Sequence, residues 1–99
     1  MAQFDLYRLA GAEGLIVDCQ SDLLSDLPTR FVIPLVADMS AALGPPRLNP
    51  VLAIDRVHYI LLAHLPAALP RGLFREPVGS AEEHRLAIQT AIDVLLAGV

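Results

Sequence analysis

LIVDCQSDLLSDLPTRFVIPLV, residues 15–36, has a pattern from which much of the fold can be predicted. Residues 15–19 alternate like a strand, with Val17 and Cys19 on one side of the pleat and Asp18 and Gln20 on the other. Turn formers at 27–29 end the middle of the stretch, and residues 30–36 return as a run of β-branched and large apolar side chains. The stretch therefore predicts two strands joined by a polar segment.

The joining segment, residues 21–26, mixes leucines with acids and turn formers and follows no clear period. Leu23 and Leu24 are thereby placed among acids in what reads as a surface segment. Singly exposed leucines are normal in soluble proteins, whereas contiguous apolar patches often mark binding sites. The pair raises the question of a binding surface without answering it.

Pro34 interrupts the second of these strands. Proline has no N–H to donate to a β-ladder, so it is usually confined to edge strands or bulges. We therefore expect this strand to lie at a sheet edge or to be bulged at Pro34.

Outward from this stretch, further strands and loops are predicted. Residues 3–8 alternate as a strand and 11–14 are turn material, so 3–8 and 15–19 form a predicted hairpin. Residues 51–54 and 57–65 form a second predicted hairpin around Asp55 and Arg56, which are not the favoured turn residues. Residues 37–43 read as a short helical turn or a strand end, and 44–50 as a loop.

Residues 80–99 have a helical pattern. Ser80 and Glu83 have the spacing of a capping box, in which side chains satisfy the first free amides of a helix. One predicted face carries Ala81, His84, Ile88, Ala91, Ile92 and Leu95, and the opposite face carries Glu82, Arg85 and Gln89. Leu96 falls within roughly 20° of the polar face at about 100° per residue, so an apolar side chain is expected to point outward.

Short strands followed by one terminal helix predict a single domain over residues 1–99, of α+β class and mainly β. The expected architecture is a curled antiparallel sheet with the helix packed on it. The chain is 55% hydrophobic, which is high for 99 residues, and part of this excess suggests an interface within a homodimer.

Charge and composition disfavour several classes of partner. The net charge is −4 and the seven basic residues are all arginines scattered singly, so direct binding to nucleic acid is not expected. The longest uncharged stretch, residues 57–70, is too short to cross a bilayer. A single cysteine and the absence of a signal-peptide pattern lead us to expect a cytoplasmic protein without a membrane partner.

No motif predicts a catalytic, cofactor or metal site. His58 and His64 would share a strand face but stand roughly 20 Å apart, too far to bind one metal ion. Cys19 could be a nucleophile beside a histidine, but burial as a small hydrophobic residue is the favoured reading. Asp18 and two further aspartates, four and eight residues later, are expected to form a solvated acidic rim. We therefore expect no enzyme, cofactor or metal.

Three blocks of the chain resemble the CcdB family, the toxins of plasmid-type toxin–antitoxin pairs. Residues 15–35 resemble the family segment with a VDVQSD core and a VIPL strand. The start, QFDLY (3–7), resembles QFKVY, and the end, AIQTAIDVLLAGV (87–99), resembles the terminal AINLMFWGI helix. The resemblance covers essentially the whole chain.

The resemblance implies a homodimer with an SH3-like barrel of curved strands and a C-terminal helix. It implies a type II toxin that binds the A subunit of DNA gyrase and traps the cleaved complex, and a cognate CcdA-like antitoxin that wraps the toxin. Nucleic acid would be reached only through the antitoxin complex. The family's gyrase-contacting positions fall on Ser21, Leu23, Leu24, Asp93, Leu96, Ala97, Gly98 and Val99.

The chain departs from the family at its end. Ala97 stands where the family has tryptophan, its main anchor in gyrase, and Asp93 stands where it has asparagine. An aromatic anchor often contributes about 2 kcal/mol or more, so its loss could weaken binding well over tenfold. Two alternatives therefore stay open: a CcdB-like protein with another target or lost toxicity that still binds antitoxin, and an endoribonuclease toxin, which the acidic charge disfavours.

Overall fold

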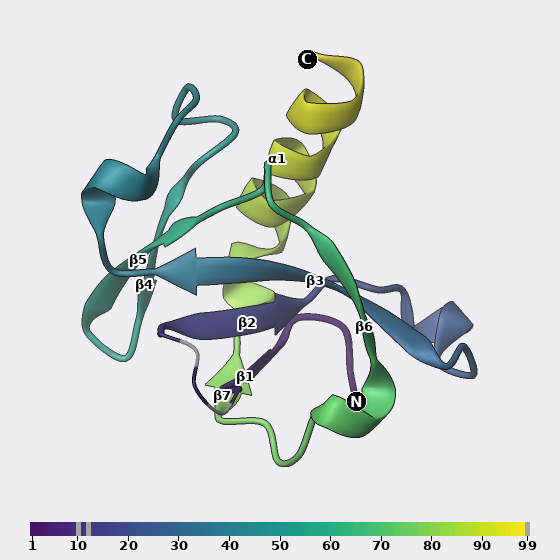
Figure 1. Cartoon of the computed structure of the whole chain (residues 1–99). Coiled ribbons are helices and arrows are strands. Elements are labelled where there is room, and N and C mark those ends of the chain that lie inside the picture. The colour runs from purple at the N-terminus through teal and green to yellow at the C-terminus, as the bar shows by residue number, and fades with distance from the viewer. Residues whose placement is uncertain (10, 12, 99) are drawn as a thin grey trace.

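The computed structural model describes residues 1–9, 11 and 13–98, and these form a strongly curved sheet with a helix (Figure 1). The strands are β1 (Asp5–Tyr7), β2 (Leu15–Asp18), β3 (Thr29–Val36), β4 (Val51–Ile54), β5 (Val57–Leu61), β6 (Ala67–Pro70) and β7 (Gly79–Ser80). Short 3₁₀ turns are η1 (Asp22–Leu24), η2 (Met39–Ala41), η3 (Arg71–Leu73) and η4 (Glu82–His84). Helix α1 spans Arg85–Ala97.

The strands pair antiparallel in the order β4-β5-β3-β2-β1-β7, and β6 also pairs with β3. Strand β3 is long enough to bond β2 along one side and both β5 and β6 along the other. The sheet curls into a half-barrel consistent with an SH3-like barrel, and the fold is α+β and mainly β, as predicted (Figure 1).

Of the two alternatives expected for the strand containing Pro34, an edge position or a bulge, the edge position is wrong, because β3 is central. Its pairing with β6 ends at Val32 and its pairing with β5 begins at Leu35. The Pro34 carbonyl accepts from the Leu62 N–H at 2.9 Å, so the proline nitrogen also faces this side, where β3 changes partners. The missing N–H therefore falls where β3 leaves β6 and begins to pair with β5, and the Leu62 carbonyl accepts instead from the Leu65 N–H at 2.9 Å.

Asp18 and Arg30 form an ion pair inside the sheet, with both side chains fully buried. Nε and Nη2 of Arg30 donate to Oδ2 of Asp18 at 2.9 and 2.7 Å. The expected solvated acidic rim is therefore wrong for Asp18, although Asp22 and Asp26 are exposed. The pair joins the last residue of β2 to the start of β3 and ties the two strands together.

Both predicted hairpins form. Strands β1 and β2 pair with Leu6 opposite Val17, and β4 and β5 pair with Ile54 opposite Val57. Asp55 and Arg56 both have positive φ, 51° and 68°, which is the geometry of a two-residue I′ turn. The tight register is therefore built without the glycine that such turns favour.

The strand predicted over 57–65 is shorter than expected, because β5 ends at Leu61. The sequence analysis predicts no strand between residues 65 and 80, yet Ala67–Pro70 forms β6, which pairs with Thr29–Val32 of β3. His64 lies in the turn between β5 and β6, so the expectation that it shares a strand face with His58 is wrong.

Helix α1 packs on the sheet through the predicted apolar face. Ile88 and Ala91 are fully buried, while Leu95 remains 39% exposed. The capping box is not formed as predicted, because the Ser80 hydroxyl accepts from the N–H of Glu82 and not from that of Glu83. The chain then forms η4 before the α-helix begins. The core that the helix closes includes Phe4, Leu6, Leu15, Val17, Ile33, Leu35, Leu52, Tyr59 and Leu61.

We expect Asp18→Asn to lower the free energy of unfolding by about 3–5 kcal/mol, because it leaves a buried guanidinium without its counter-ion. A urea titration measures the change. Glu82→Gln is the matched control, since it removes a carboxylate from the exposed pair with Arg85, where the expected loss is below about 1 kcal/mol. A double variant, Asp18→Val with Arg30→Met, should recover much of the loss; a loss under about 1 kcal/mol for Asp18→Asn alone would contradict this role.

Candidate functional surface

The turn η1 holds the predicted leucines outside the core. Ser21 precedes the turn, and its hydroxyl accepts from the Leu23 N–H at 3.2 Å. Leu23 is 94% exposed and Leu24 is 51% exposed. The expectation that these leucines lie at the surface is confirmed, and their role in binding stays a prediction.

Gln20 fastens this turn to the sheet. Its side-chain Nε2 donates to the Leu24 carbonyl at 2.8 Å, and its Oε1 accepts from the Phe31 N–H at 3.0 Å. Its own backbone N–H donates to Oδ1 of Asp18, the carboxylate that Arg30 neutralises. A continuous set of hydrogen bonds therefore runs from the buried ion pair to the last residue of the turn.

Gln3 holds the same turn from the N-terminal side. Its backbone N–H donates to Oδ1 of Asp22 at 2.8 Å, and its Nε2 donates to the Cys19 carbonyl at 3.0 Å. The turn is thus bound to β3 on one side and to the segment before β1 on the other. Ordering the backbone in advance reduces the entropy lost when an exposed side chain enters a partner.

The end of α1 is the second exposed apolar segment. Leu96 is 77% exposed, as its helical position predicted, and Asp93, Ala97 and Gly98 are also exposed. Gly98 has φ 78° and donates its N–H to the Val94 carbonyl, which ends the helix in the left-handed conformation that glycine favours. Val99, also predicted as a contact residue, lies outside the described residues.

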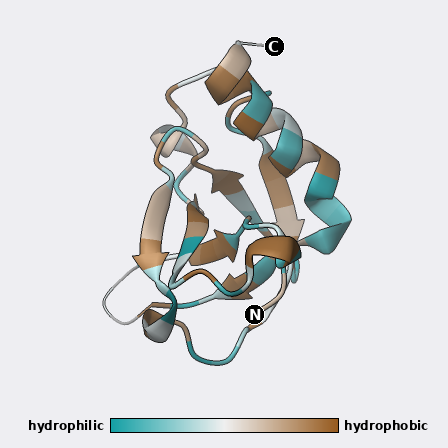
Figure 2. Ribbon diagram, turned by 90° about the vertical axis from the view of Figure 1, so that its right-hand side faces the viewer, coloured by the Kyte–Doolittle hydropathy of each residue, from teal (hydrophilic) through white to brown (hydrophobic). Residues whose placement is uncertain are grey.

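The two segments lie far apart within one chain. Figure 1 shows the last turns of α1 projecting above the sheet, while η1 lies at its lower right. Figure 2, turned about the vertical axis, keeps this vertical separation and shows apolar residues in the last turn of α1 beside the C-terminus. A single chain therefore presents the predicted contact positions on two separate apolar surfaces, one at η1 and one at the end of α1.

Cys19 is not arranged as a nucleophile. It is buried, and its Sγ lies 3.7 Å from the Val17 carbonyl. Burial, with a smaller effect of the Asp18 charge, raises the pKa of the thiol to about 12, so almost none is thiolate at neutral pH. Among the described side chains no hydrogen bond joins it to a histidine, and the expectation of a small buried residue is confirmed.

The histidines serve local structure. His64 Nδ1 lies 3.0 Å from the Asn49 side-chain amide, and His84 Nε2 lies 2.9 Å from the Ala53 carbonyl. Within residues 1–9, 11 and 13–98 no group of three or more potential ligands could hold a metal ion. No helix in the same residues is long and apolar enough to cross a membrane.

Sequence reasoning found the exposed leucines but missed the residues that position them. The sequence pattern predicts a solvated position for Asp18 and assigns no role to Gln20 or Arg30, although Asp18 and Gln20 lie within the block that resembles the VDVQSD core. The available signal was the alternation itself, which puts Asp18 and Gln20 on one face of a strand whose neighbours are apolar. Their partners on β3 lie 11 and 12 residues away, so the sequence pattern could not identify them.

We expect Gln20→Met to loosen η1, because it leaves the Phe31 N–H and Leu24 carbonyl without partners. The free energy of unfolding should fall by about 1–3 kcal/mol, and hydrogen exchange at the amides of Leu24 and Leu27 should rise about tenfold more than in α1. Gln89→Met, an exposed change on α1, is the control and should stay within about 0.5 kcal/mol of wild type. Equal exchange at η1 in both variants would show that Gln20 does not hold the turn.

Comparison with protein families matches residues 3–98 to the model described as CcdB protein. This range includes both exposed segments except Val99. No curated protein matches the chain.

Proposed function

The chain belongs to the CcdB family, a family of toxins from toxin–antitoxin modules, and from that premise we propose that it inhibits DNA gyrase by binding the A subunit and trapping the cleaved complex. The main support is that the family's contact positions fall on apolar side chains that face solvent. Leu23 is 94% exposed and Leu96 is 77% exposed. No covalent step by this protein is part of the proposal. It acts by differential affinity for one conformation of another enzyme.

Burial of these exposed apolar side chains in a partner would supply free energy for binding. Fully burying a leucine side chain contributes roughly 1.5–3 kcal/mol, so three such residues entering a partner supply a substantial part of a stable complex. The hydrogen bonds of Gln20 and Gln3 hold the first pair of leucines in place before binding. Binding therefore requires little ordering of this turn.

We further propose that the chain acts as a homodimer neutralised by a cognate CcdA-like antitoxin. A dimer presents η1 and the end of α1 twice, in symmetric positions, which suits a target that is itself built from two A subunits. The many exposed large apolar residues, among them Leu43, Val51 and Leu65, leave apolar surface for such an interface. We propose the cytoplasm as its location, because gyrase and DNA are there.

Ala97 favours a second candidate function. It stands in place of the family's tryptophan, and its methyl group offers far less surface than an indole ring for insertion into a partner. A protein with this end could bind antitoxin while having another target or no toxicity. Growth arrest on expression, with rescue by a short reading frame just upstream, separates an active toxin from this candidate.

The proposal is tested with purified protein in gyrase supercoiling and cleavage-trapping assays. Wild type at micromolar dimer should inhibit supercoiling and accumulate cleaved DNA. Leu96→Arg should abolish both effects, because a charge at this position opposes burial in the target. No effect of the wild type at micromolar dimer would count against gyrase as the target.

Leu86→Arg is the matched control. Leu86 lies on the same helix and is also 77% exposed, but it is outside the predicted contact set. Both variants should unfold within about 0.5 kcal/mol of wild type, because both sites are at the surface. Equal loss of gyrase inhibition by the two variants would overturn the assignment of the helix end as the contact.

A further inference from the structure

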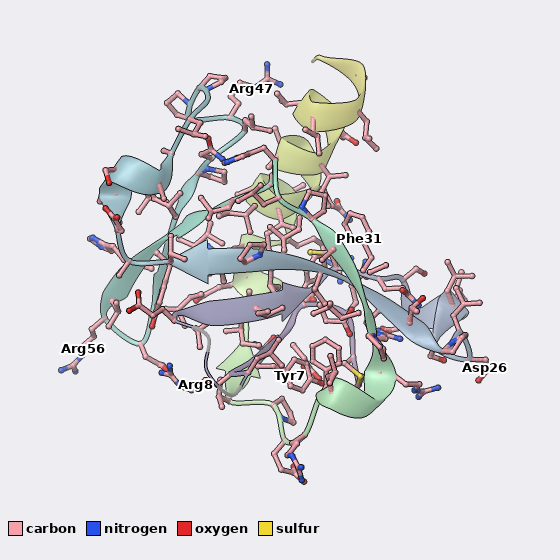
Figure 3. All side chains as sticks on the ribbon, in the orientation of Figure 1. Tyr7, Arg8, Asp26, Phe31, Arg47 and Arg56 are labelled. Atoms are coloured by element: carbon pink, nitrogen blue, oxygen red, sulfur yellow. The ribbon has the colours of Figure 1, made fainter. Side chains whose placement is uncertain are left out.

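A hollow of about 420 Å³ opens at the end of the molecule opposite the helix terminus. It lies between the residues that follow β1 and the turn η3, and its lining consists of Arg8, Leu9, Gly72, Leu73 and Arg75. Its volume falls within the range of ligand sites, about 300–1,000 Å³. In Figure 3, Arg8 lies at the lower left, whereas Arg47 lies near the top and Asp26 at the far right.

The two walls of the hollow are joined by an aromatic contact. The Tyr7 and Phe74 rings meet edge to face, with centroids 5.1 Å apart. Tyr7 is buried and directly precedes Arg8, and Phe74 lies between Leu73 and Arg75 in the chain. The two rings therefore point inward, and their neighbours in the chain line the hollow. Hydrogen bonds from Arg71 to the Pro28 carbonyl and from Val78 to the Leu6 carbonyl hold the same segments. The hollow is therefore built into the fold.

The hollow carries positive charge on an acidic protein. Its lining includes two guanidinium groups and no carboxylate, although the chain as a whole has net charge −4. Neither Arg8 nor Arg75 takes part in an ion pair within the described residues. Glu76, next to Arg75, is exposed and forms no ion pair with these residues either. Two free guanidinium groups at one hollow favour an anionic ligand, above all a carboxylate held by paired N–H donors.

The hollow also offers apolar surface. Leu73 is 54% exposed, Leu9 is half-buried, and Gly72 contributes no side chain. A second, smaller hollow of about 140 Å³ shares Arg8 and is lined mainly by apolar residues, including Leu15, Ile54 and Val57, with Asp55. Arg8 thus lines both hollows, so an extended peptide could contact the two of them in succession.

We propose that this hollow binds an acidic peptide segment of a partner protein. A carboxylate of the peptide lies between Arg8 and Arg75, and a neighbouring leucine-like side chain packs on Leu9 and Leu73. Nucleic acid fits less well, because the hollow supplies only two guanidinium groups for a phosphate backbone, and such a backbone gains nothing from the leucines. The site is separate from η1 and the end of α1, and it does not depend on gyrase being the target.

The test uses two blocked peptides, acetyl-Glu-Leu-Glu-Glu-Leu-Glu-amide and the same peptide with glutamine in place of each glutamate. Titration of the ¹⁵N-labelled full chain at low salt follows the amides of Leu9, Gly72 and Leu73. We expect saturable shifts with the glutamate peptide and a dissociation constant at least about tenfold weaker with the glutamine peptide, because each peptide–guanidinium pair is charge-assisted. Higher salt should weaken binding.

Two kinds of variant test the residues. Arg8→Gln with Arg75→Gln should weaken binding of the glutamate peptide at least about tenfold, whereas Arg47→Gln, which removes another exposed arginine at the other end, should leave it unchanged. Gly72→Leu should also weaken binding while keeping both charges, because a Cβ at Gly72 meets no atom within 4 Å and the added side chain fills the hollow. Unchanged spectra elsewhere establish that each variant is folded.

Three results would overturn the proposal. They are equal binding of the glutamine peptide, equal weakening by Arg47→Gln, and absence of shifts at the lining amides up to millimolar peptide. Inorganic phosphate serves as a probe for a general anion site. If phosphate shifts the same amides as strongly as the peptide and Gly72→Leu has no effect, the site takes small anions and the peptide proposal is wrong.

Discussion

Asp18 and Arg30 meet with both side chains sealed from water, and the structure around the proposed contact surface depends on this pair. A buried ion pair is not a strong source of stability, because the loss of hydration offsets most of the attraction between the charges. The pair restricts the strand geometry, because leaving either buried charge without its partner would greatly lower the free energy of unfolding. The pair therefore fixes how the end of β2 faces the start of β3, although Nη1 of Arg30 is buried without a hydrogen-bond partner among the described residues.

The position of η1 follows from this constraint. Oδ2 of Asp18 is used by Arg30 and Oδ1 by the Gln20 N–H, and Gln20 then spans from β3 to the Leu24 carbonyl. The Gln20 side chain and the Leu24 carbonyl are satisfied inward, and Leu23 and Leu24 are left facing water beside the exposed Asp22 and Asp26. The polar network thus explains how a small domain can keep apolar residues exposed without collapsing them into its core. At the end of α1 an apolar side chain is exposed for a different reason, because Leu96 lies on the face of the helix turned away from the sheet.

Much of the fold could be predicted from local patterns, because alternation and helical spacing report directly on which side of an element is buried. Both hairpins, the terminal helix and the exposure of Leu96 were predicted in this way. Errors arose wherever a residue's environment is set by a distant segment. Asp18 looked solvated because Arg30 is its partner across the sheet, and Pro34 looked like an edge residue because the change from β6 to β5 beside it leaves no trace in the sequence. The separation of η1 from the helix end depends on the whole topology and could not be predicted from spacing.

The central claim is that η1 and the end of α1 are the surfaces that enter the target, while the polar network beneath them only holds them in place. Hydrogen exchange of the protein, measured alone and with purified gyrase A subunit in excess, tests this claim most directly. We expect slowed exchange over residues 21–27 and 93–98, with β4, β5 and the hollow at Arg8 unchanged. Protection confined to other strands, or unaltered exchange throughout at concentrations that inhibit gyrase, would contradict it.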